Sequence, residues 1–123
     1  MKNQTGLGWR AMDWQESGTE DGVRLIALSG DIDLQHSPRM RELLQTVIAD
    51  KTSVLLMDFS GVSYIDSSGL ATLVEYYQNS RAFEGRIGLF GLSDRVESVF
   101  GLVRLNQIFS IFKTEEDART GLL

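Results

Sequence analysis

The apolar residues of this chain follow two spacings that alternate along it. Short continuous apolar runs are typical of buried strands, whereas a three-to-four-residue repeat is typical of one face of an amphipathic helix. Largely apolar runs lie at residues 23–28, 54–59 and 86–91, each with one charged residue. The helical repeat follows the first run, at Met40, Leu43, Leu44, Val47 and Ile48. The pattern therefore predicts strands alternating with helices.

The N-terminal part predicts an antiparallel hairpin. Residues 9–16 alternate loosely between apolar and polar, residues 17–22 are rich in turn formers, and the apolar run 23–28 follows. We expect Trp9 and Trp14 to pack against this hairpin.

Four helices are predicted after the hairpin. Ser37 is expected to cap the first, and Pro38 presets the backbone for it. The second begins after a polar turn and turns one face inward, with Leu70, Leu73, Val74 and Tyr77. The third begins near residues 93–94 and turns inward Val96, Val99, Phe100 and Val103. An edge strand over 108–112 and a last short helix from Glu115 complete the chain.

The order β-β-α-β-α-β-α-β-α predicts an α/β fold. Its sheet would be mixed, with the N-terminal hairpin antiparallel and the other strands mainly parallel, covered by about four helices. The 123 residues are enough for one domain, expected over 9–122 after a flexible extension at 1–8.

Composition excludes several classes of function. Lysine and arginine number 12 and aspartate and glutamate 17, so the net charge is −5, which argues against a nucleic acid or an anionic membrane as partner. The absence of cysteine excludes disulfides and thiolate chemistry. Because no signal peptide or membrane-spanning run is evident, we expect a cytoplasmic protein. We expect no metal and no cofactor, since neither a zinc ligand set nor a phosphate-binding glycine loop is present.

The polar residues with the most chemical interest are Asp66, Ser67, Ser68 and Gly69, between a strand and a helix. A serine at a helix start can carry a phosphate that accepts hydrogen bonds from backbone N–H groups of the first turn. Asp66 could orient a kinase or pair with a basic residue of a partner. An ordinary capped helix start explains the same residues.

A serine hydrolase is the enzyme alternative, and the sequence disfavours it. His36 is the only histidine. The residues before Ser67 lack the small residue that a nucleophile elbow needs. We expect His36 to be an exposed loop residue and the protein not to be an enzyme.

Two other groups of residues have alternative interpretations. Asp31 and Asp33 precede the first helix and either solvate a loop or form an acidic rim that meets a basic partner. They are too few for a calcium site. Tyr76 belongs either to the core or, if exposed, to an interface as an anchor.

Three segments of the sequence resemble a known family. Residues 66–70 following residues 58–62 are similar to the signature of STAS domains of the bacterial anti-sigma-factor antagonist type. Residues 30–33 resemble the acidic loop of that family, and residues 99–112 its C-terminal segment.

The resemblance implies a partner-switching protein. The unphosphorylated form would bind an anti-sigma factor that is a serine kinase, phosphorylation of Ser67 would release it, and a serine phosphatase would reset it. A monomer or weak dimer is expected. The partner-binding surface would comprise Asp31, Asp33, Asp66, Ser67, Ser68, Gly69, Leu70, Thr72 and Leu73. The alternative is a STAS domain without phosphorylation, as a subunit of a lipid-transport ABC complex or as another signalling adaptor.

Overall fold

One five-stranded sheet organises the protein, described for residues 11–20 and 22–123 of a computed structural model. The sheet order is β1-β2-β3-β4-β5, in which β1 pairs antiparallel with β2 and all other neighbours are parallel. This confirms the predicted mixed sheet with an N-terminal hairpin. The strands are β1 (Asp13–Glu20), β2 (Val23–Ile32), β3 (Val54–Ile65), β4 (Arg86–Phe90) and β5 (Ser110–Phe112).

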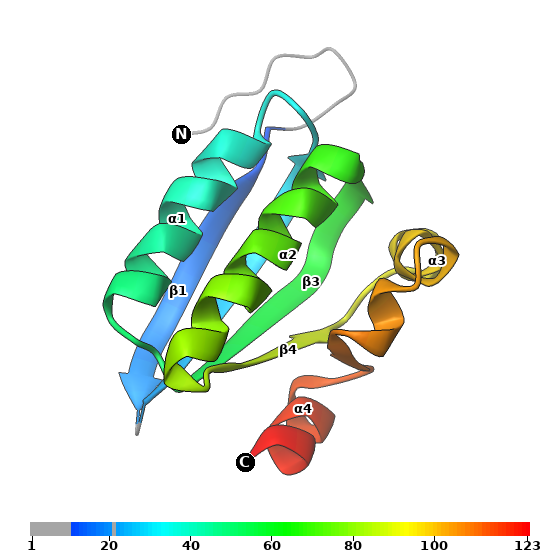
Figure 1. The fold of residues 1–123 in the computed structure, drawn as a ribbon. Coiled ribbons are helices and arrows are strands. Elements are labelled where there is room, and N and C mark those ends of the chain that lie inside the picture. Colours follow the sequence, from blue (N-terminus) through cyan, green and yellow to red (C-terminus); the bar gives the residue numbers. More distant parts are fainter. Residues whose placement is uncertain (1–10, 21) are drawn as a thin grey trace.

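Helices cover both faces of the sheet. On β3, Leu55 and Met57 face the larger core, whereas Val54 and Leu56 face a smaller core that includes Ala118. Figure 1 shows α1 and α2 lying side by side on one face of the sheet, with their axes roughly along the strands. The helices are α1 (Ser37–Ala49), α2 (Ser67–Ser80), α3 (Asp94–Leu102) and α4 (Glu115–Leu122), with 3₁₀ turns at Arg81–Phe83 and Leu105–Gln107. In the described part of the chain, no helix combines the length and apolar character needed to cross a bilayer.

The strands are longer than the apolar runs predict. β1 continues to Glu20 through part of the expected turn, and β3 continues to Ile65. The reason is backbone pairing, which is independent of side-chain polarity. β2 and β3 remain paired up to Ile32 opposite Ile65, across register shifts between residues 27 and 29 and between residues 30 and 31. The expected polar turn before residue 66 is therefore strand.

Two helix ends differ from the prediction. His36, not Ser37, is the N-cap of α1, and no side chain caps that end; Ser37 is the first helical residue and is buried. Val103 is exposed rather than inward-facing, because α3 ends at Leu102 and the chain turns away.

The aromatic predictions are largely confirmed. Tyr76 is 2% exposed and belongs to the core, so the interface-anchor alternative for it is wrong. Trp14 packs against the core, and the guanidinium of Arg39 lies 4.7 Å from its ring centroid. Trp9 and the predicted extension at residues 1–8 lie outside the described residues.

The fold brings two helix starts to one edge of the sheet. Ile32 and Ile65 pair at the carboxyl ends of the parallel strands β2 and β3. The connections after both strands therefore leave the sheet at the same edge and lead directly into α1 and α2 (Figure 1). In α/β sheets this edge is where binding sites form.

Candidate functional site

The carboxylate of Asp66 connects the two helix starts. Its Oδ1 accepts hydrogen bonds from the backbone N–H of Ser68 at 2.9 Å, the hydroxyl of Ser68 at 2.6 Å and the backbone N–H of Gly69 at 3.2 Å. Its Oδ2 accepts from the backbone N–H of Leu34 at 3.1 Å. One side chain therefore caps α2 and holds the connection before α1.

These hydrogen bonds lower the pKa of Asp66 below its ordinary value. Partial burial acts in the opposite direction, but donation from the Ser68 hydroxyl and from the N–H groups of Gly69, Ser68 and Leu34 outweighs it. Asp66 therefore caps α2 and holds the connection before α1, and its pairing with a kinase or with a basic partner residue stays a prediction.

Ser67 and Ser68 differ in what their hydroxyls contact. Ser67 is the first residue of α2 and is exposed. Among the described residues, its hydroxyl has no hydrogen-bond partner. The hydroxyl of Ser68, in contrast, is donated to Asp66. The first serine is accessible to another protein and the second is engaged in the cap.

The expected cradle of free N–H groups around Ser67 is not what the structure shows. The side chain of Asp66 takes the N–H groups of Ser68 and Gly69, and its backbone carbonyl takes that of Leu70. Competition from the cap is the physical reason, because the carboxylate at the N-cap already accepts from two of the amides that an added anion would use.

Four residues predicted to bind a partner point into the protein instead. Gly69, Leu70, Thr72 and Leu73 are buried, and the hydroxyl of Thr72 bonds to the backbone carbonyl of Ser68. A Cβ at Gly69 would lie 2.8 Å from side-chain atoms of Ile32 and Ile65. These four residues pack inside the protein and support the start of α2, and their part in partner binding stays a prediction.

Asp33 holds the residue before the first helix, His36. Oδ1 of Asp33 accepts from the backbone N–H of His36 at 3.0 Å and lies 2.7 Å from its Nδ1. The side chain of His36 is only 12% exposed, so the prediction of an exposed loop histidine is wrong. Pairing with Asp33 draws the ring inward. Among the described residues the hydroxyl of Ser67 has no hydrogen-bond partner, so the structure does not pair it with His36 as a serine nucleophile would need.

Asp31 and Leu34 complete the site. Asp31 is half-buried and pairs with Tyr64 across β2 and β3. Leu34 was not singled out from the sequence, yet it is 76% exposed beside the cap of α2. An apolar residue within a polar connection was the available signal.

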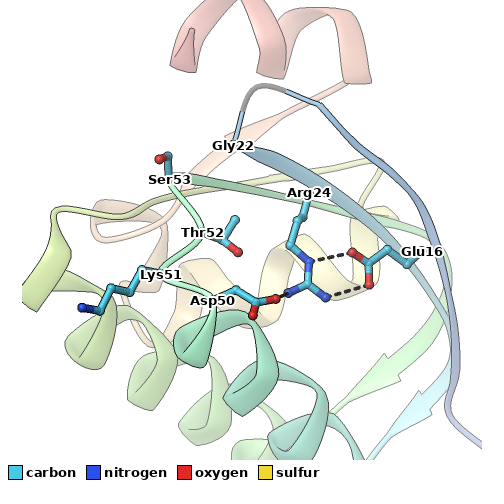
Figure 2. A pocket seen from close by; sticks show the side chains of 7 residues that line it. All are labelled: Glu16, Gly22, Arg24, Asp50, Lys51, Thr52 and Ser53. Carbon is cyan, nitrogen blue, oxygen red and sulfur yellow. Dashed lines mark hydrogen bonds and ion pairs between the residues drawn. The ribbon is translucent and has the colours of Figure 1, made fainter.

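A second polar cluster lies at the other end of β3, around a cavity of about 370 Å³. Figure 2 shows Arg24 between Glu16 and Asp50. Nε and Nη2 of Arg24 donate to Glu16 at 2.6 and 2.7 Å, and Nη1 donates to Asp50 at 2.9 Å. These ion pairs join β1, β2 and the end of α1. The sequence pattern does not indicate these pairs, because the partners lie 8 and 26 positions from Arg24.

Comparisons with known proteins agree with this architecture. A model of the STAS domain family matches residues 16–118. The anti-sigma-B factor antagonist of Listeria monocytogenes is 34% identical over 90 residues, covering 73% of this chain and 79% of that protein. The anti-sigma-B factor antagonist of Staphylococcus aureus is 25% identical over 96 residues, covering 78% and 89%. The crystal structure of an anti-sigma factor antagonist from Mycobacterium paratuberculosis has a TM-score of 0.82 at 26% identity, covering 91% of this chain and 94% of that chain. The chain therefore belongs to the STAS domain family.

Proposed function

We propose that this protein is a cytoplasmic anti-sigma-factor antagonist, without enzymatic activity, that is controlled by phosphorylation of Ser67. The unphosphorylated form binds an anti-sigma factor of the serine-kinase type, and a serine phosphatase restores that form. The names of the relatives support an anti-sigma factor as partner. The observation that carries the proposal is the contrast between the exposed, unpartnered hydroxyl of Ser67 and the capped hydroxyl of Ser68 within the described chain.

The reaction is a phosphoryl transfer to Ser67. A bond forms between Oγ of Ser67 and the γ-phosphorus of ATP, the bond from that phosphorus to the bridging oxygen breaks, and ADP leaves. The hydroxyl proton passes to a base of the kinase. The chain contributes an accessible hydroxyl on the rigid first turn of α2, which the Asp66 cap holds in place.

Charge explains release after transfer. Phosphoserine carries about −1.5 to −2 charges near neutral pH. The amides of Ser68, Gly69 and Leu70, which could help to neutralise it, are already bonded to Asp66. The new charge therefore stays at the surface, beside the Asp66 carboxylate and against the phosphates of the bound nucleotide, where like charges repel. Little backbone movement is needed for the partner to leave.

Mass-spectrometric mapping of phosphate tests the proposal. The chain is incubated with ATP and each serine-kinase anti-sigma factor encoded by its genome, and Ser67→Ala and Ser68→Ala serve as matched variants. We expect phosphate in the wild type and Ser68→Ala but not in Ser67→Ala. Equal incorporation into Ser67→Ala would contradict the assignment.

Binding to the same kinase provides the second test. Ser67→Ala should bind as the wild type does, and Ser67→Asp should bind more weakly because it places a charge at the docking surface. A pull-down from native cells that recovers an ABC ATPase and no kinase would contradict the proposal and favour a transport-complex subunit.

A further inference from the structure

Leu34 is a solvent-exposed apolar residue at the same edge of the sheet as Ser67. It is 76% exposed, and only Leu102 is more exposed among the large apolar residues that the structure describes. A single exposed leucine is common on protein surfaces and has no meaning by itself. Leu34 differs from such residues in two ways: hydrogen bonds restrain its backbone, and it lies next to the helix start that carries Ser67.

The backbone around Leu34 is held on both sides. Its N–H donates to Oδ2 of Asp66 at 3.1 Å. The preceding residue, Asp33, accepts from the backbone N–H of His36 at its carboxylate and from that of Ser37 at its carbonyl. The leucine is therefore presented from a restrained connection, which lowers the entropy lost when a partner covers it.

The same carboxylate places Leu34 beside the proposed phosphoacceptor. Asp66 caps α2, whose first residue is Ser67, and its other oxygen holds Leu34. In Figure 1 the cyan connection between β2 and α1 lies at the same end as the start of α2. A kinase that brings its nucleotide to the hydroxyl of Ser67 must cover this neighbourhood.

We propose that Leu34 is the apolar anchor for the serine-kinase anti-sigma factor and enters a hydrophobic pocket on its surface. The inference rests on the proposed function and adds the chemistry of the contact. Asp33, with 30% of its side chain exposed, and the half-buried Asp31 lie beside it, so the rim of the pocket carries basic side chains. Apolar anchors in closed pockets carry much of the affinity of such interfaces.

Binding measurements on side-chain variants test the anchor. Leu34→Ser removes the apolar group and leaves the backbone N–H for Asp66, whereas Leu34→Met keeps an apolar side chain. Leu102→Ser on α3 is the matched control, because Leu102 is 84% exposed. Titration calorimetry with the purified kinase gives each affinity. We expect Leu34→Ser to bind about tenfold to a hundredfold more weakly, with Leu34→Met and Leu102→Ser within about threefold of the wild type.

Phosphorylation kinetics separate docking from chemistry. Leu34→Ser should raise the KM for Ser67 phosphorylation and leave kcat unchanged, because the hydroxyl itself is untouched. An unchanged urea midpoint verifies that the variant is folded. If the wild type binds and Leu34→Ser binds equally well, or if Leu102→Ser loses as much, the anchor is refuted while the proposed function stands. If the wild type binds no kinase, both are refuted. A changed sedimentation of Leu34→Ser alone would instead identify a second copy as the occupant.

Discussion

Replacement of Asp66 measures how firmly the candidate site is held. Asp66→Ala removes the acceptor for two backbone N–H groups at the start of α2, for the Ser68 hydroxyl and for the N–H of Leu34. Loss of an N-cap costs about 0.5–2 kcal/mol, and loss of a negative charge at a helix start costs about 0.3–1 kcal/mol more. The N–H of Leu34 is exposed, so water replaces its bond at little cost. The free energy of unfolding should fall by about 1–3 kcal/mol.

Asp66→Asn separates the charge from the hydrogen bonds. Its amide oxygen still accepts from the first turn of α2, but its NH₂ group cannot accept from Leu34, so a loss of about 1 kcal/mol is expected. Urea unfolding at pH 7 provides the measurement, and a loss of about 2 kcal/mol lowers the midpoint by about 1 M. Glu42→Ala, exposed on α1, is the control and should change stability by less than about 0.5 kcal/mol.

The pH dependence follows from the lowered pKa of Asp66. A carboxyl whose folded pKa is lowered contributes stability above its ordinary value of 3.8 and loses it as the pH falls through the folded pKa. The advantage of the wild type over Asp66→Asn should therefore be complete at pH 7 and disappear at acidic pH. A free energy of unfolding for Asp66→Ala within about 0.5 kcal/mol of the wild type at pH 7 would show that the cap does not hold the site.

Three further predictions concern the frame that carries the site. Arg24 donates to Glu16 and lowers the pKa of that carboxyl. Glu16→Gln should therefore lower the free energy of unfolding by about 1–2 kcal/mol at pH 7 and leave it unchanged once the pH falls well below 4.5. A loss of stability that persists at acidic pH would contradict the ion pair. Gly69→Ala should destabilise the fold by about 1–3 kcal/mol, because the added Cβ would lie 2.8 Å from Ile32 and Ile65. Gly101→Ala should stabilise it by about 1 kcal/mol, because no atom lies within 4 Å of that added Cβ. Urea midpoints of the two variants that shift in the same direction would refute this. Tyr76→Phe should raise the thermal midpoint, since its buried hydroxyl has no partner in the described chain and burial raises its pKa to about 12; a lower midpoint would reveal a partner such as bound water.

Local patterns explain why the element order could be predicted. A strand that is buried on both faces is apolar at nearly every residue, whereas a helix with one buried face is apolar at every third and fourth residue. That information lies within each segment. The pattern identified the start of α2 at Ser67 and the inward face with Leu70 and Leu73. It failed at segment ends, because β3 runs on to Ile65 through backbone pairing with β2.

The candidate site needed contacts between distant segments. The bond from the N–H of Leu34 to Asp66 joins residues that lie 32 positions apart. The inward position of His36 depends on the exact path of the connection after β2. Arg24 meets Asp50 only because β2 and the end of α1 lie together in the fold. None of these pairs has a signature in the local order of residues.

The sequence by itself determined the α/β order, the polar segment at the start of α2 and the two aspartates before α1, because burial periodicity and helix capping are local properties. The tertiary structure alone decided which of these polar groups remain available. In the folded protein Ser67 is exposed, the hydroxyl of Ser68 donates a hydrogen bond to Asp66, and Leu34 is exposed. The physical reason is that a hydrogen-bonding group is engaged or free according to the partners that folding brings within about 3 Å of it.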